Sequence, residues 1–166
     1  MGEPLILDRW APGAVGGVAA LHARFYARSH GFGAVFEAKV ARELGDFLTR
    51  LDPARGDLFR CAMDAEGRVL GSIALDAGDR SPEGFWHLRW FILDAALRGQ
   101  GLGRRWLAEA VAAARAGGAP GVYLWTLAGL DAAAALYAAA GFVVTQRVAA
   151  TQWGKEMEEI RMALRF

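Results

Sequence analysis

The sequence predicts an α/β domain in which helices cover both faces of a mixed sheet. A strand-like run, 86–93, is followed by a glycine-rich loop and then by an amphipathic helical pattern. Two apolar runs earlier in the chain, 58–63 and 69–75, are separated by a short turn and indicate an antiparallel hairpin. Hairpins that come first and β–α–β units that come later predict both antiparallel and parallel neighbours in the sheet.

Size and composition indicate one folded domain, 1–166. The chain has 166 residues, of which 54% are hydrophobic and 22% charged, so it can bury a core. Its formal net charge of +1 provides no overall field for nucleic acid or an anionic membrane, and neither is a predicted partner. The single Cys61 excludes an internal disulfide and a cysteine zinc site, and no metal is predicted. No apolar run approaches the roughly 20 residues that span a bilayer, and the N-terminus lacks a basic-then-apolar leader, so we expect a cytoplasmic protein.

The first half of the chain is predicted to supply one strand, two helices and the hairpin. An apolar run at 5–8 ends in a Pro-Gly turn. Helical periodicity follows over 14–29 and 35–51, with a short glycine-bearing loop between the two helices. The polar segment 76–84 contains glycine and proline and is predicted to be a loop that leads into the central strand.

The second half alternates helices and strands. Beyond the central strand, the helix after the glycines presents apolar residues at spacings of three and four and ends at Gly117-Gly118. The remaining elements are a buried strand over 122–126, an alanine-rich helix over 131–140, a strand that begins at 141–144 and a last strand over 160–166.

The glycine-rich loop is predicted to bind phosphate. Gly99, Gly101 and Gly103 lie between a strand and a helix, where free backbone N–H groups meet the positive end of the helix dipole. The dinucleotide fingerprint needs a glycine where this chain has Arg104, and no Lys-Ser/Thr pair follows, so a nucleotide-binding domain of another fold is disfavoured.

Two motifs resemble the GNAT N-acetyltransferase superfamily. One is Arg98-x-x-Gly101-x-Gly103, and the other is the segment Leu136-Tyr137-Ala138-Ala139-Ala140-Gly141-Phe142. Four further segments are similar to the acetyltransferase module that some bacterial proteins carry behind a MarR-type DNA-binding domain: 88–91, 124–126, 130–133 and 153–155. This chain has no room for that domain. The resemblance implies a GNAT-type fold, acetyl-CoA as the cofactor and, as in many relatives, a homodimer.

The resemblance also implies which residues hold the cofactor. Backbone N–H groups of the loop are expected to surround the pyrophosphate: Arg98, Gly99, Gln100, Gly101, Leu102, Gly103 and Arg104. Main-chain groups of Phe91, Ile92 and Leu93 are expected to pair with the pantetheine arm, as a peptide adds to a sheet edge. Relatives often have asparagine at the position of Leu130, so that contact is not carried over.

Acid–base chemistry has three candidates. The family's usual glutamate position at the start of the central strand corresponds to His87, whose ordinary pKa of about 6.5 suits proton removal near neutral pH. Glu83, just upstream, is the competing base, and a purely structural role for His87 also remains open. Tyr137 matches the family's tyrosine and is the candidate acid for the departing thiolate, with core packing as the alternative.

By the layout of the GNAT family that it resembles, the chain is expected to bind its acceptor between the first two helices and the ends of the central strands. An aromatic wall with one or two carboxylates would attract an amine. The candidates are Tyr26, His30, Phe32, Glu37, Arg89 and Trp125. Phe36 is expected to belong to the core.

The favoured interpretation is therefore an acetyl-CoA-dependent N-acetyltransferase that acetylates a primary amine of a small molecule or peptide directly. The alternative is an acyl-CoA-binding sensor or regulatory module without turnover, which the uncertain base and Leu130 keep open.

Overall fold

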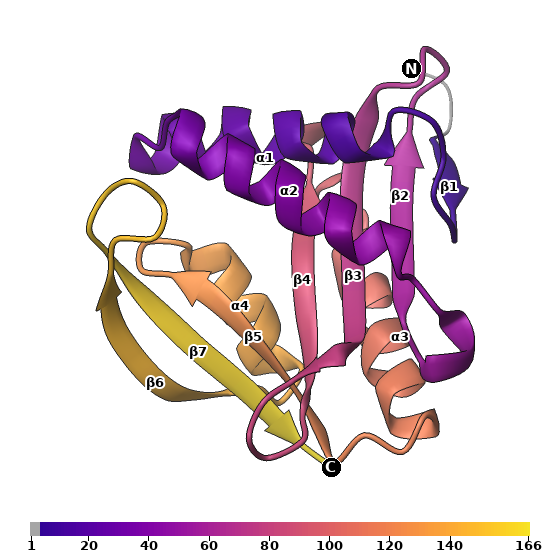
Figure 1. Ribbon diagram of the computed structural model, residues 1–166, viewed down its shortest axis with the longest axis vertical. Coiled ribbons are helices and arrows are strands. Elements are labelled where there is room, and N and C mark those ends of the chain that lie inside the picture. Colours follow the sequence, from indigo (N-terminus) through magenta and orange to yellow (C-terminus); the bar gives the residue numbers. More distant parts are fainter. Residues whose placement is uncertain (1–3) are drawn as a thin grey trace.

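A computed structural model describes residues 4–166 and contains one seven-stranded sheet in the order β1-β2-β3-β4-β5-β7-β6. Helices α1 and α2 cover one face of this sheet, and α3 and α4 cover the other (Figure 1). The elements are β1 (Leu5–Leu7), α1 (Ala14–His30), α2 (Ala34–Thr49), η1 (Pro53–Arg55), β2 (Leu58–Met63), β3 (Val69–Arg80), β4 (Trp86–Leu93), η2 (Ala95–Leu97), α3 (Leu102–Ala116), β5 (Gly121–Leu127), α4 (Asp131–Ala139), β6 (Val143–Ala150) and β7 (Met157–Arg165).

The predicted mixed sheet is confirmed. The strands from β1 to β4 pair antiparallel in sequence order, β4 and β5 are the parallel pair, and β7 pairs antiparallel with both β5 and β6. The predicted bounds of β2 and β4 are correct, and most other elements differ by a few residues at their ends. Among residues 4–166, no helix combines the length and the apolarity that a membrane span requires.

The predicted loop over 76–84 is wrong in its first half, because β3 continues to Arg80. Asp76 is fully buried there and receives two hydrogen bonds from the Arg50 guanidinium, at 2.9 and 2.5 Å. The backbone N–H groups of Gly78 and Asp79 also donate to this carboxylate. A carboxylate with this many donors is tolerated inside a sheet, which a polar sequence pattern does not reveal.

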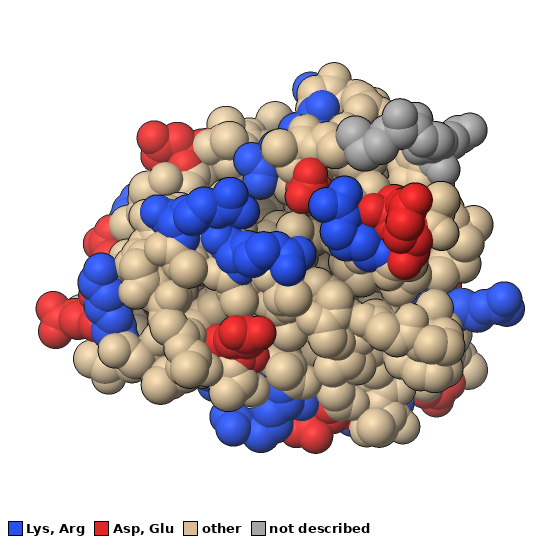
Figure 2. All heavy atoms as spheres, turned by 90° about the horizontal axis from the view of Figure 1, so that it is seen from above, with Lys and Arg blue, Asp and Glu red and all other residues tan. Residues whose placement is uncertain are grey.

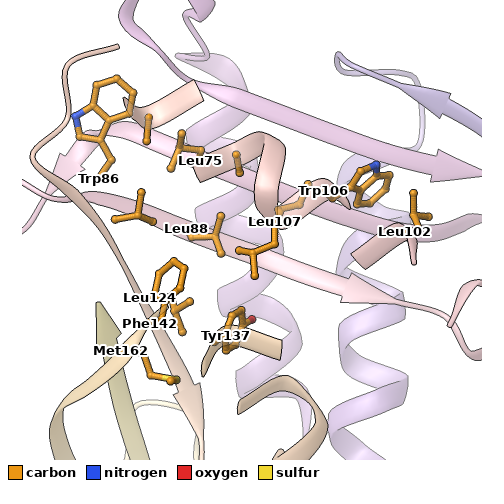
Figure 3. Packing of buried hydrophobic residues seen from close by; sticks show 14 of the residues in the cluster. Leu75, Trp86, Leu88, Leu102, Trp106, Leu107, Leu124, Tyr137, Phe142 and Met162 are labelled. Carbon is orange, nitrogen blue, oxygen red and sulfur yellow. The ribbon is translucent and has the colours of Figure 1, made fainter. Parts of the chain in front are cut away.

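Two hydrophobic clusters lie on opposite faces of the sheet. In the first, Trp106 and Leu107 of α3 and Tyr137 of α4 pack against Leu75, Leu88 and Leu124 of the strands (Figure 3). The second cluster joins the inner sides of α1 and α2 to the other face of the sheet. There the rings of Phe47 and Trp90 pack with their centres 5.5 Å apart.

A β-bulge makes β4 change faces in its middle. The register with β3 shifts between Ser72 and Ala74, and Trp90 has a φ of 45°, a left-handed value that a tryptophan rarely adopts. The buried Ser72 hydroxyl donates to the Trp90 carbonyl at 2.7 Å and holds the bulge. Trp86 and Leu88 therefore pack with α3, whereas Trp90, two residues further on, packs with α1 and α2.

The bulge coincides with a split between β4 and β5. The two strands pair only at Trp86–Val122 and His87–Tyr123 and then diverge (Figure 1). From Leu88 onward, the edge of β4 that faces β5 has no strand partner within the described residues. The split leaves main-chain groups in the middle of the sheet available to a ligand.

Candidate active site

The loop at the C-terminal end of β4 presents a row of unused donors. Within residues 4–166, the main-chain N–H groups from Gly99 to Arg104 donate to no backbone or side-chain acceptor. Gly99 and Gly101 have φ values of 75° and 78°, which glycine adopts without strain, and Gly101 is the N-cap of α3. Successive N–H groups at the positive end of a helix form an anion-binding site.

The three glycines of this loop have different roles. A Cβ atom at Gly99 or Gly101 would lie in open space, so their side-chain-free backbone is exposed to a ligand. A Cβ at Gly103 would come within 3.2 Å of Leu93 and 3.6 Å of Phe91, so Gly103 permits close packing of α3 on β4.

The Arg98 side chain ties the loop to its surroundings. Its Nε donates to the Leu93 carbonyl at 2.9 Å, and its guanidinium lies 5.4 Å from the ring centre of Phe25 on α1. The Leu93 carbonyl is therefore occupied, whereas Phe91 lies in the stretch of β4 that has no partner toward β5 among residues 4–166, and Ile92 is in register with Ser72 of β3.

Lys and Arg side chains gather around a hollow at this end of the molecule. Figure 2 shows the end that α1 crosses, with the basic side chains near its middle and fewer acidic ones beside them. A protein with a formal net charge of only +1 thus has a locally basic surface that favours an anionic ligand.

A cavity of about 560 Å³ opens between α1, α2 and the parted strands. Its lining comes from almost every part of the fold: His22, Tyr26, Phe36, Lys39, Val40, Glu43, Asp79, His87, Leu88, Arg89, Trp90, Phe91, Leu124, Trp125, Thr126, Leu127, Leu130, Ala133, Tyr137, Gln152, Trp153 and Glu159.

At the closed end of the split, His87 is held by Asp79 and Tyr123. Its Nδ1 donates to Asp79 Oδ2 at 2.8 Å, its ring stacks on Tyr123 with the centres 4.3 Å apart, and the Tyr123 hydroxyl donates to Asp79 at 3.3 Å. Burial lowers the pKa of His87 below its ordinary value, against the opposing effect of Asp79. His87 is therefore neutral near pH 7, with Nδ1 protonated, and Nε2, which has no hydrogen-bond partner among residues 4–166, can accept a proton.

Next to this histidine, an ion-pair network fixes the charged wall of the cavity. Glu43 of α2 pairs with both Arg89 and Lys39, and Arg89 also lies 3.7 Å from Asp79. Burial raises the pKa of Glu43, but the two cations outweigh it and hold this pKa below the usual value. Glu43 is thus ionised and already neutralised by protein groups.

Tyr137 lies where the cavity meets the α3 side of the sheet. Its side chain is 7% exposed and packs between Phe91 and Phe142. Burial raises the pKa of its hydroxyl above the ordinary value. The described hydrogen bonds of residues 4–166 include none to this hydroxyl, which is therefore a protonated donor without a protein acceptor.

Comparison with known proteins gives a family and a fold. Residues 33–142, more than half of the chain, match the acetyltransferase (GNAT) family. The chain belongs to this family.

Solved structures agree with this assignment at the level of the fold. A ribosomal-protein-alanine N-acetyltransferase from Brucella melitensis superimposes with a TM-score of 0.69 at 18% identity, covering 98% of this chain and 99% of that one. A GNAT phosphinothricin acetyltransferase from Sinorhizobium meliloti, solved with acetyl-CoA, gives 0.68 at 18% identity over 98% and 88%. A GNAT acetyltransferase from Streptococcus pneumoniae gives 0.67 at 21% identity over 99% and 100%. No curated protein sequence matched.

As a GNAT family member, the protein is an N-acetyltransferase, and acetyl-CoA is its cofactor. The cavity of this GNAT protein brings together Tyr26, Arg89 and Trp125 from the predicted acceptor set, together with His87 and Tyr137.

Four of the predicted acceptor and base residues do not line the cavity. Phe32 is buried in the α1–α2 core, and Glu37 is exposed. His30 bonds instead to the Ala128 carbonyl at 3.0 Å. Glu83 is exposed and pairs with Arg161 at 3.1 Å, which leaves His87 as the base candidate inside the cavity.

Sequence reasoning missed Glu43, Asp79 and Glu159. Glu43 has the pattern of an ordinary helix-surface residue, and Asp79 falls in a segment predicted to be a loop. Glu159 is buried on β7, just before the predicted start of that strand. No local signal marks these carboxylates, because long-range packing brings them together.

Proposed function

We propose that this enzyme transfers the acetyl group of acetyl-CoA directly to a primary amine of a small molecule or peptide. The observation that carries the proposal is the split of β4 from β5, which has unused main-chain donors beyond its open end and a neutral, carboxylate-held histidine at its closed end.

The loop fits the diphosphate of coenzyme A. Within the described part of the chain, the main-chain N–H groups of residues 99–104 have no acceptor, and no atom lies within 4 Å of a Cβ built at Gly99 or Gly101. The edge of β4 that faces β5 is available to the pantetheine amides at Phe91, while the Leu93 carbonyl is taken by Arg98. Ile92 is in register with Ser72, and its main-chain groups face β3 as those of Asp94 do. Bound there, acetyl-CoA supplies an activated thioester carbonyl.

His87 is the proposed general base. An ammonium must lose a proton before the nitrogen can attack a carbonyl, and a neutral imidazole accepts that proton. Asp79 orients the ring through Nδ1 and compensates the positive charge that His87 acquires when Nε2 is protonated.

Tyr137 is the proposed acid. Its hydroxyl stays protonated across the physiological range and has no described protein acceptor, so it is available to protonate the departing thiolate.

Direct transfer is favoured because the cysteine is unsuitable as a nucleophile. Cys61 is fully buried in β2 and does not line the cavity, and burial raises the pKa of its thiol to about 11. An acyl-cysteine intermediate would need a thiolate that faces the cofactor.

The test is release of free coenzyme A thiol from acetyl-CoA in the presence of a panel of primary amines. Amine-dependent release that His87→Gln abolishes supports the proposal. Tight binding of acetyl-CoA without thiol release for any amine would favour the non-catalytic sensor instead.

Other sequence-based expectations stay predictions. They are a cytoplasmic location, a homodimer, no nucleic-acid or membrane partner, and the closer likeness to modules fused to MarR-type regulators.

A further inference from the structure

We propose that Glu159 binds a second cationic group of the acceptor, so that the preferred substrate is a diamine or another amine with a separate positive charge. This inference rests on the proposed function, because it names the class of amine that the same cavity takes.

Glu159 is a buried carboxylate that lines the cavity. It is 5% exposed, and its Oε1 accepts hydrogen bonds from Gln152 Nε2 at 2.6 Å and from the Trp153 indole N–H. These donors lie between β6 and β7 and hold the carboxylate in one orientation. Among the ion pairs of residues 4–166, none provides a cation for Glu159.

The charges of the cavity do not balance without a ligand. Lys39 and Arg89 supply two formal positive charges, and both are committed to Glu43, with Arg89 also near Asp79. Burial lowers the pKa values of His22 and His87, so these rings add no positive charge near neutral pH. Among the described residues that line the cavity, three carboxylates against two cations leave a formal charge of −1, at Glu159. A buried carboxylate without a counter-charge is costly, and a bound cation removes that cost.

Glu159 and the proposed base are at different ends of the cavity. In the sheet register, His87 of β4 lies opposite Tyr123 of β5, and Glu159 of β7 lies opposite Leu127, four residues further along β5. Four residues of extended strand correspond to about 13 Å between the two backbone positions. The carboxylate is held toward the β6–β7 connection, so a single ammonium does not contact both groups.

Aromatic rings near Glu159 also suit a cation. Trp153 packs against Phe36 with the ring centres 5.3 Å apart, and Tyr26 lies 4.9 Å from Phe36. Lys39 already lies 5.4 Å above the Trp153 ring, which shows that the surface accepts positive charge.

The test compares three acceptors of similar length that differ in one end group: 1,5-diaminopentane, 5-amino-1-pentanol and 6-aminohexanoate. Thiol release is measured with wild type, Glu159→Gln and Glu158→Gln. The matched control, Glu158, is the exposed neighbour that pairs with Arg147 at 3.2 Å outside the cavity.

We expect wild type and Glu158→Gln to favour the diamine over the amino alcohol by about 10- to 100-fold in kcat/KM, mainly through KM, as for a charge-assisted hydrogen bond. Glu159→Gln should bring the ratio close to one. Equal use of the diamine and the amino alcohol by wild type, a preference for 6-aminohexanoate, or an unchanged ratio in Glu159→Gln would overturn the proposal.

Binding of the three compounds to the coenzyme A complex, measured by calorimetry, separates this inference from the function it rests on. If no amine is acetylated, tighter binding of the diamine that depends on Glu159 still supports charge recognition, and equal binding of all three overturns it. If the melting temperature shows that Glu159→Gln does not fold, the proposal is judged by the wild-type ratio of kcat/KM for the diamine to that for the amino alcohol.

Discussion

The proposed cofactor loop comes from one continuous segment, 98–104, whereas the proposed acceptor cavity takes side chains from α1, α2, β3, β4, β5, α4 and β7. The loop is proposed to bind through main-chain N–H groups on an exposed surface, and its side chains matter mostly where a glycine is needed. The cavity works through buried, mutually dependent polar side chains. Substitutions in the loop should therefore change acetyl-CoA binding independently of folding stability. Substitutions in the cavity should instead change how activity and stability depend on pH.

The largest effect is expected for Gly101→Glu in the loop. A side chain directed into the ligand space, carrying a negative charge, should weaken acetyl-CoA binding about 100-fold or more, measured by calorimetry. Gly118→Glu is the matched control, because Gly118 lies at the other end of α3 with a φ of 79° and the same open surroundings. Both variants should lose similar thermal stability. Equal acetyl-CoA affinities in the two would contradict the assignment of the loop.

Tyr137→Phe tests whether the Tyr137 hydroxyl, between the loop and the cavity, acts as the proposed acid. Removal of the hydroxyl should lower kcat by about 10- to 100-fold, because the thiolate then departs without a proton donor. The affinity for acetyl-CoA and the melting temperature should change little, since the hydroxyl has no described protein partner. Wild-type turnover in this variant would reduce Tyr137 to a packing residue.

Asp79→Asn tests the coupling within the cavity through pH. If His87 must be neutral to act, kcat/KM should fall on the acid side with a midpoint below the ordinary pKa of histidine, because burial lowers the pKa of His87. Asp79 opposes this shift, so its replacement should move the midpoint to still lower pH. Persistence of the same acid limb in His87→Gln would assign it to another group.

The smallest effect on turnover is expected for His22→Gln. For this variant the quantity to measure is the free energy of unfolding as a function of pH. Burial lowers the pKa of His22 from 6.5 to about 4, so the unfolded chain takes up a proton that the folded protein resists. The free energy of unfolding should therefore be highest above pH 6.5 and fall by about 3 kcal/mol from this residue as the pH drops toward 4. Denaturant titrations at several pH values should show a shallower decline in His22→Gln, and identical declines would contradict this assignment.

Much of the fold followed from local pattern. The bounds of β2 and β4, the glycine-rich start of α3 and the mixed sheet were predicted because periodicity and glycine placement act on neighbours in the chain. The length of β3 was not predicted, because buried Asp76 depends on Arg50 from a distant segment.

The sequence by itself determined the order of elements and the loop of free N–H groups, since both depend on residues adjacent along the chain. Only the tertiary structure decided which groups face the cavity. Strict alternation puts Leu88 and Trp90 on one face, but the bulge held by Ser72 sends them to opposite faces. The same long-range packing brings Asp79 to His87 and leaves Glu159 without a counter-charge among the described ion pairs. Such arrangements depend on contacts between residues far apart in the chain, which no local pattern encodes.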